Sequence, residues 1–184
     1  MRSRWIMTAA AAGAVALLTV PTLLTRQRAA VGAAVMPPPK GSTCKAESAA
    51  NLNLTVKDTH GGPVKLADYK GKVILLNFWA TWCGPCKLEI PDLIDAYNQY
   101  RDRGFVVLGV LTEDEPSPKE LSAFTRQYKM NYPLVMMQED LETAYGPIFG
   151  LPTTFVIARD GSICHKHMGP ITKEVMEQEI KALL

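Results

Sequence analysis

In the body of the chain, the apolar positions follow strand-like and helix-like patterns in turn. Two continuous apolar runs, 72–80 and 105–111, have the length of strands that are covered on both faces. Between them, apolar residues at helical spacing, among them Leu88 and Leu93, predict a helix over about 86–103 with these residues on its inner face. These three elements predict a β-α-β unit around a buried sheet.

The rest of the pattern adds helices and a hairpin to this unit. The expected elements are, in chain order, a helix over 119–130, a strand over 134–137, strands over 153–158 and 162–167 joined by a turn at 159–161, and a helix over 172–184. A β-α-β-α-β order followed by a hairpin and a helix predicts an α/β fold, in which helices flank a mixed central sheet.

The segment 1–28 has the pattern of a membrane anchor or an export signal. Residues 5–25 carry no charge, and arginines flank them on both sides. A helix over this stretch would be about 31 Å long at ~1.5 Å per residue, which is enough to cross the apolar core of a bilayer. A cleaved signal peptide with its site near 31–33 is the alternative, although Arg26 and Arg28 would then lie between its apolar core and that site.

The remaining chain reads as a linker and one folded domain with nearly balanced charge. The segment 29–50 is rich in Ala and Pro, which is typical of a linker, and 51–184 has the length of a single domain. Four of the 20 Lys and Arg residues lie in the segment 1–28, which leaves 16 basic residues against all 18 acidic ones. This balance leaves no basic surface for a nucleic acid, so we expect no nucleic-acid partner.

Cys83 and Cys86 form a C-x-x-C motif where the first expected strand turns into a helix. The free backbone N–H groups and the dipole at a helix N-terminus favour a thiolate over a thiol. We therefore expect Cys83 to be exposed and to attack a disulfide, while Cys86, half covered, resolves the mixed disulfide. The other chemistry of such a pair is a zinc site, but the sequence has no second C-x-x-C and no nearby H-x₃₋₅-H to complete it.

Two separated motifs carry a resemblance to a known family. The stretch 78–87 (FWATWCGPCK) resembles the active site of thioredoxin-like proteins, and 148–155 (IFGLPTTF) resembles their loop with a cis-proline that faces the cysteine pair. The residues 89–91 (EIP) and the long segment 113–150 are similar to the TlpA/ResA-type branch of thiol-disulfide oxidoreductases. This resemblance, over about 50–184, implies a thioredoxin-like fold with an N-terminal extension and a central insert.

The resemblance also implies an activity and its partners. It implies a thiol-disulfide oxidoreductase whose redox group is the Cys83–Cys86 pair, with no other cofactor. Members of the branch are membrane-anchored or secreted, and they typically reduce disulfides in apocytochrome c or in copper-site proteins of respiratory oxidases. For this chain we expect such client disulfides as partners, together with an integral-membrane thiol electron donor. We also expect a domain on the periplasmic or extracytoplasmic side of the cell membrane, held by a single N-terminal pass.

The dipeptide between the two cysteines bears on the direction of the reaction. Gly84-Pro85 resembles the reducing members, since strongly oxidising ones stabilise their thiolate much more. We therefore expect a reductant. A general disulfide oxidase or isomerase stays open, as does a copper-binding assembly chaperone that uses the cysteine pair as soft ligands.

Asn77 stands where thioredoxin has a buried acid in its central strand, so another group must accept the proton of the resolving thiol. Glu89 lies three residues after Cys86, on the same helical face, and the TlpA/ResA-type branch has an acid at the matching place. Burial would raise the pKa of Glu89, which could then take the Cys86 proton. A solvated acid on the helix surface is the alternative.

The client is expected to dock beside the cysteines. We expect a cis bond before Pro152, which would turn the backbone of Leu151 toward Cys83 and leave its N–H and C=O free to pair with an extended client segment. We expect Trp82 to be an exposed apolar platform over the thiols, with ordinary core packing as the alternative. The expected substrate-binding residues are Trp82, Gly84, Pro85, Leu151 and Pro152.

Two other groups of residues have metal-binding or disulfide chemistry. Outside the cytoplasm, Cys44 and Cys164 would form a structural disulfide, with free buried thiols as the alternative. His165 and His167 would share one face of a strand, but two nitrogens without a third partner do not complete a metal site. We therefore expect no metal.

Overall fold

The computed structural model of the 184-residue chain describes residues 44–46 and 48–184. The stretch expected to be an anchor or a signal lies outside these residues, as does most of the expected linker. Among the helices of the described part, none is both long enough and apolar enough to cross a membrane. The expected boundaries between anchor or signal, linker and domain, at residues 28 and 50, stay a prediction.

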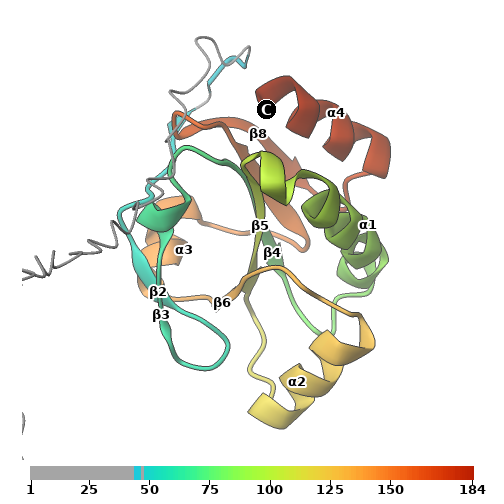
Figure 1. The fold of residues 1–184 in the computed structure, drawn as a ribbon. Coiled ribbons are helices and arrows are strands. Elements are labelled where there is room, and N and C mark those ends of the chain that lie inside the picture. The colour runs from blue at the N-terminus through green and yellow to red at the C-terminus, as the bar shows by residue number, and fades with distance from the viewer. Residues whose placement is uncertain (1–43, 47) are drawn as a thin grey trace, which may run out of the picture. The chain divides into compact units, whose positions relative to one another are not determined.

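A six-stranded mixed sheet forms the centre of the described domain, with the strand order β1-β8-β7-β4-β5-β6 (Figure 1). The strands are β1 (Ser48–Ala49), β4 (Val73–Trp79), β5 (Phe105–Leu111), β6 (Leu134–Met136), β7 (Thr153–Ile157) and β8 (Ser162–Met168). β4, β5 and β6 are mutually parallel, whereas β7 runs antiparallel to β4, and β8 pairs antiparallel with both β7 and β1. The expected α/β fold class with a mixed sheet is confirmed.

The central strand β4 is covered on both faces, which explains why all of its residues except Asn77 are apolar. Its side chains alternate between the faces. Ile74 and Leu76 belong to the core cluster that contains residues of α3 (Glu139–Tyr145). Val73 and Leu75 belong to the cluster that contains residues of α1 (Gly84–Tyr100) and α4 (Lys173–Leu183). The alternation places the next odd-numbered residue of β4, number 77, on the face toward α1.

The helices divide between the two faces of the sheet. In Figure 1, α1 and α4 lie side by side on one face, and α3 lies on the other with a small second sheet. That sheet pairs β2 (Thr55–Lys57) with β3 (Pro63–Lys65). The remaining helix, α2 (Pro118–Gln127), begins with a capping box between Ser117 and Glu120. Helices therefore lie on both faces of the sheet, and residues 80–83 connect the end of β4 to the first turn of α1.

The structure corrects the expected inner face of α1. Leu88 is 78% exposed, whereas Ile90 and Leu93 are buried. Leu88 precedes Ile90 by two residues, which corresponds to a rotation of about 200° around the helix axis. It therefore points away from the buried stripe of its own helix.

Several short elements do not appear in the sequence pattern. These elements are β1, β2, β3, α3 and two single turns of 3₁₀-helix at Leu66–Tyr69 and Arg101–Arg103. Contacts from distant parts of the chain hold some of them in place. The backbone N–H of Lys57, at the end of β2, donates to Gln138 Oε1 at 2.8 Å, and the next residue, Asp58, forms a β-bridge with Val135. Local periodicity carries no signal of such partners.

A disulfide attaches the start of the described chain to the sheet. Cys44 is bonded to Cys164 in β8, with their Cα atoms 5.4 Å apart. β1, which follows Cys44, pairs with the same strand through Ser48 and Ile163. The expected pairing of these two cysteines is confirmed, and both Cys44 and β1 fall inside the segment expected to be linker.

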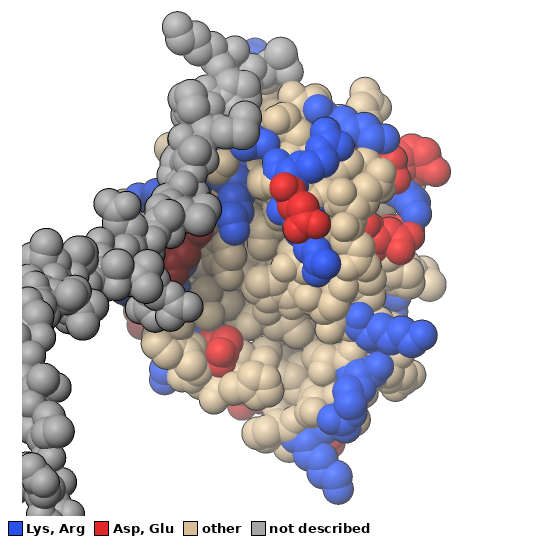
Figure 2. All heavy atoms as spheres, viewed as in Figure 1, with Lys and Arg blue, Asp and Glu red and all other residues tan. Residues whose placement is uncertain are grey.

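Charge is mixed over the surface of the domain. On the face shown in Figure 2, uncharged side chains form the middle, and Lys and Arg side chains lie mostly toward its edge, with acidic side chains among them. This mixture agrees with the near balance of charge in the sequence.

Candidate redox site

The cysteine pair lies at the junction of β4 and α1. Cys83 is the N-cap of α1, and its sulfur accepts a hydrogen bond from the backbone N–H of Cys86 at 3.1 Å. Pro85 occupies the first turn, where no backbone N–H is needed. The two cysteines form a disulfide, with Cα atoms 5.3 Å apart. When the pair is reduced, the same N–H and the helix dipole would stabilise a thiolate on Cys83.

The expected exposure of the two cysteines is wrong in this disulfide form. Cys83 is 3% exposed and Cys86 is 1% exposed. Both sulfurs belong to an apolar cluster with Trp79 and Leu121, because the bond to Cys86 and the N-cap contact turn the Cys83 side chain inward. The intervening dipeptide, Gly84-Pro85, is exposed instead and forms the outer surface over the disulfide.

Trp82 is an exposed side chain, as expected, and is not part of the core. Its indole is 59% exposed, and its Nε1–H donates to the backbone oxygen of Glu113 at 3.0 Å. The preceding Thr81 donates its backbone N–H to Asp114 Oδ2 at 2.7 Å, and its hydroxyl donates to the same oxygen. The loop after β5 therefore fixes the two residues that precede Cys83. The sequence carries no signal for this role of Asp114, because only the fold brings the loop to the site.

The bond between Leu151 and Pro152 is cis, as expected. A second cis bond, between Gly146 and Pro147, was not expected. Leu151 packs against the cluster that contains both active-site cysteines, so this loop lies beside the disulfide. The Pro152 carbonyl accepts the backbone N–H of Gly169 at 2.8 Å, which ties the end of β8 to the same loop.

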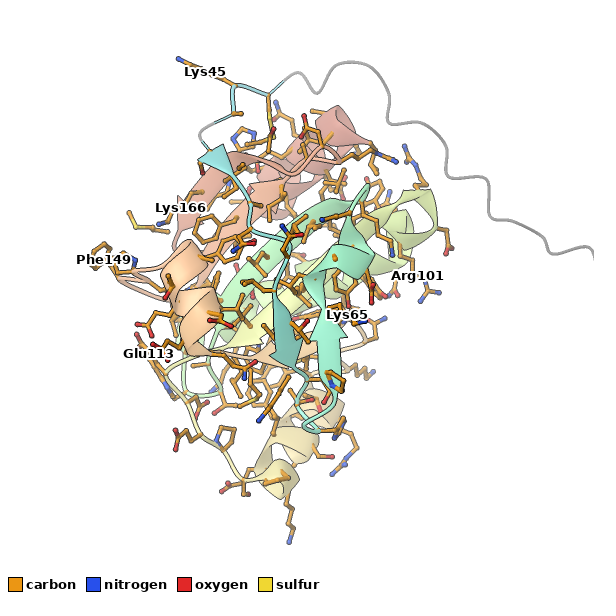
Figure 3. The ribbon with its side chains drawn as sticks, turned by 90° about the vertical axis from the view of Figure 1, so that its left-hand side faces the viewer. Lys45, Lys65, Arg101, Glu113, Phe149 and Lys166 are labelled. Atoms are coloured by element: carbon orange, nitrogen blue, oxygen red, sulfur yellow. A yellow bond between two sulfur atoms is a disulfide. The ribbon has the colours of Figure 1, made fainter. Side chains whose placement is uncertain are left out.

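Two exposed apolar residues near this loop were not expected as part of the docking surface. Phe149 precedes Pro152 by three residues and is 82% exposed, and Figure 3 shows it projecting outward from the domain. Met168 is 71% exposed and pairs in register with Thr153, the residue after Pro152. The only signal in the sequence for the exposure of Phe149 is that it is a large apolar residue in a loop rich in Gly and Pro.

Glu89 is buried within the domain, which rules out the alternative of a solvated acid. It is 3% exposed, and its Oε1 accepts a hydrogen bond from Asn77 Nδ2 at 2.7 Å. Its Oε2 accepts the backbone N–H of Ile171 at 3.4 Å. Burial raises the pKa of Glu89 to about 7, although these two hydrogen bonds oppose the rise. A carboxyl group with this pKa can take or give a proton near neutral pH.

Asn77 is the link between this carboxylate and the rest of the sheet. Its Nδ2 also donates to Thr154 Oγ1 at 3.0 Å, and both residues are at most 1% exposed. In the sequence, Asn77 is recognisable only as the residue that replaces an acid. The sequence carries no signal for Thr154 or for the N–H of Ile171, because both come from segments far along the chain.

The histidines of β8 share one face, as expected. His167 Nε2 lies 3.0 Å from Glu179 Oε2, and His165 Nδ1 lies 3.6 Å from the other oxygen of the same carboxylate. Within the described residues, no group of three or more His, Cys, Asp or Glu side chains is arranged to hold a metal ion.

Known proteins resemble this chain over the domain that holds the site. The AhpC/TSA family matches residues 47–166. The thioredoxin-like protein YneN of Bacillus subtilis is 35% identical over 128 residues, which cover 70% of this chain and 75% of that protein. The thiol-disulfide oxidoreductase ResA of Bacillus thuringiensis is 34% identical over 132 residues, which cover 71% of this chain and 75% of that protein. The crystal structure of a thiol:disulfide interchange protein from Chlorobium tepidum has a TM-score of 0.68 and 28% identity, over 76% of this chain and 98% of that one.

Proposed function

Since the chain belongs to the AhpC/TSA family, within its ResA/TlpA-type thioredoxin-like branch, and is a thiol-disulfide oxidoreductase, we propose that it reduces client disulfides outside the cytoplasm while tethered to a membrane. One observation carries the redox part of this proposal. The Cys83–Cys86 pair sits at the N-terminus of α1, and Glu89, a buried acid with a pKa of about 7, follows on the same helix.

In the first step, the reduced Cys83 thiolate attacks one sulfur of a client disulfide. A bond forms between Cys83 Sγ and that sulfur, the client S–S bond breaks, and the other client sulfur leaves as a thiolate. The backbone N–H of Cys86 and the α1 dipole favour Cys83 over Cys86 as the ionised thiol. Cys83 is therefore the nucleophile.

In the second step, Cys86 resolves the mixed disulfide. Its thiol passes a proton to Glu89, and the resulting thiolate attacks Cys83 Sγ. The Cys83–Cys86 bond forms, and the second client sulfur leaves as a thiolate. Two electrons have then moved from the cysteine pair to the client, and the oxidised pair is the form that the structure describes.

Exposed apolar side chains around the site provide the contact with the client. Trp82, Phe149 and Met168 are each more than half exposed, and the loop with the cis bond to Pro152 lies beside the disulfide. Contacts of this kind suit an extended client segment whose backbone pairs with Leu151. Exposed apolar surface is typical of sites that bind other proteins.

The resemblance to the TlpA/ResA-type branch supports a proposal for the clients and the electron donor. We infer that the clients are apocytochrome c or copper-site proteins of respiratory oxidases. The apolar run at 5–25 supports a membrane tether, with the domain on the periplasmic or extracytoplasmic side. Cytosolic reductases cannot reach a domain in that position, so an integral-membrane dithiol protein must return the two electrons.

The redox equilibrium with glutathione tests the direction of transfer. We expect the full-length protein, kept in detergent, to have a reduction potential closer to that of thioredoxin, about −270 mV, than to that of DsbA, about −120 mV. The reason is that the N-terminus of α1 is the one feature found among the described residues that favours the thiolate at Cys83, and that Gly84-Pro85 resembles the dipeptide of the reducing members. A potential near that of DsbA would contradict the reductant assignment and support a disulfide oxidase.

A further inference from the structure

A small polar network is buried where four segments of the chain meet. Its members are Asn77 in β4, Glu89 in α1, Thr154 in β7 and the backbone N–H of Ile171 in the segment before α4. The side chains of Asn77, Glu89 and Thr154 are at most 3% exposed. Buried polar groups cost free energy unless they are hydrogen-bonded. Loss of any one of these hydrogen bonds would therefore leave a buried polar group without a partner.

The amide of Asn77 is fixed in orientation by its two acceptors. Both hydrogen bonds leave from the same nitrogen, one to Glu89 Oε1 at 2.7 Å and one to Thr154 Oγ1 at 3.0 Å. An amide nitrogen has two N–H groups, so this arrangement uses both of them. Asn77 and Thr154 are also direct partners in the antiparallel pairing of β4 and β7. Without Thr154 Oγ1, one N–H of Asn77 would lose its acceptor.

The bond from Asn77 is the shorter of the two that Glu89 accepts. A hydrogen bond donated to a carboxylate favours the ionised form, and it is stronger than one between neutral groups. Two other groups that interact with Glu89 do not stabilise its ionised form. The Asp92 carboxylate, on the same helix, disfavours a charge on Glu89, and the Tyr132 hydroxyl interacts electrostatically with it. Asn77 and Ile171 therefore supply the stabilisation of ionised Glu89.

We propose that Asn77 and Thr154 are positioning residues for Glu89: Thr154 Oγ1 fixes the amide of Asn77, which holds ionised Glu89 ready to accept the proton of Cys86. This inference rests on the proposed function, in which Glu89 is that acceptor. It extends the site from helix α1 across β4 to β7, the strand that directly follows the loop with Pro152.

The test compares Thr154→Val with Thr154→Ser in the full-length oxidised protein. Val keeps the shape and the β-branch of Thr but removes the hydroxyl, whereas Ser keeps the hydroxyl. We expect Thr154→Val to raise the pKa of Glu89 by about one unit, and Thr154→Ser to leave it near the wild-type value. NMR titration of the Glu89 side-chain carboxyl carbon measures this pKa without any assay of activity.

The rate of mixed-disulfide resolution gives the second readout. With a pKa raised from about 7 to about 8, the ionised fraction of Glu89 at pH 7 falls about fivefold, and at pH 9 it hardly changes. Resolution by the Thr154→Val protein should therefore be about fivefold slower at pH 7 and should recover at pH 9. A purely structural loss would lower the rate equally at both pH values.

The outcomes separate this inference from the proposed function. An unchanged Glu89 titration in Thr154→Val would overturn the positioning role. A raised pKa with no change in the rate at pH 7 would support the positioning role and count against Glu89 as the proton acceptor. If Thr154→Val does not fold, Thr154→Ala, which also removes the hydroxyl that accepts from Asn77, gives the same test: a raised Glu89 pKa would support the positioning role, and an unchanged one would overturn it.

Discussion

Glu89 is the one charged side chain that is buried in the part of the chain the structure describes. Its position, three residues after Cys86 on α1, was predictable from the sequence by helical spacing. Its burial and its partners were not, because Asn77 and Ile171 reach it from a central strand and from a segment 82 positions away. The exposure of Cys83 was mispredicted for a related reason, since the disulfide turns its sulfur into the core.

The substitution Glu89→Gln tests the role of this carboxyl group. Wild-type exchange should rise with pH through about 7, because Glu89 accepts a proton only when it is ionised. The Gln variant keeps the shape but cannot accept the proton. We expect its Cys86 pKa to be lower and its exchange to be about 10–100-fold slower at neutral pH, with little difference near pH 5, where Glu89 is protonated.

The decisive data for this prediction are pH profiles of disulfide exchange for both proteins. The matched control is Asp92→Asn, which removes a neighbouring charge of α1 and keeps the proton acceptor, so it should preserve the pH-dependent rise. Superimposable profiles for wild type and Glu89→Gln would mean that the proton leaves through water instead.

At the scale of elements, length and burial decide what the sequence pattern could predict. β4 and β5 are seven residues each and covered on both faces, so a continuous apolar run identified them. β1, β2 and β3 have two or three residues each, and their pairing partners rather than their own pattern define them. The motif 78–87 lies at the end of the long strand β4, whereas the motif 148–155 leads into the five-residue β7 and was predictable only from its resemblance to a known loop.

The Cys44–Cys164 disulfide is expected to stabilise the domain without taking part in exchange. It closes a loop across 120 residues of sequence, for which the chain-entropy model gives a stabilisation of about 4–5 kcal/mol. Replacing both cysteines with Ser should lower the free energy of unfolding by up to this amount. Urea unfolding measures the change, and the exchange rate of the Cys83–Cys86 pair serves as the control.

Two results would contradict this role of the disulfide. An unchanged urea midpoint in the double variant would show that the bond adds no stability. A loss of exchange activity in a variant that still folds would show that the bond takes part in the reaction.

At the scale of the whole molecule, the redox site combines segments from both halves of the domain. Cys83 and Glu89 come from the first β-α unit, and the loop with Pro152 and the exposed Met168 come from the C-terminal hairpin. The antiparallel pairing of β4 with β7 joins the halves, and Asn77 opposite Thr154 is one register pair of that junction. The same junction thus holds the fold together and carries the polar contacts of the proposed proton acceptor.

The central claim is that Cys83 attacks the client disulfide and Cys86 resolves it. The most direct measurement traps the intermediate: the full-length Cys86→Ser protein is reduced, mixed with a peptide that contains a disulfide, and analysed by mass spectrometry. We predict a stable mixed disulfide that joins the peptide to Cys83, and no adduct in a Cys83→Ser control. An adduct on Cys86 in the Cys83→Ser protein, with none in the Cys86→Ser protein, would contradict the claim.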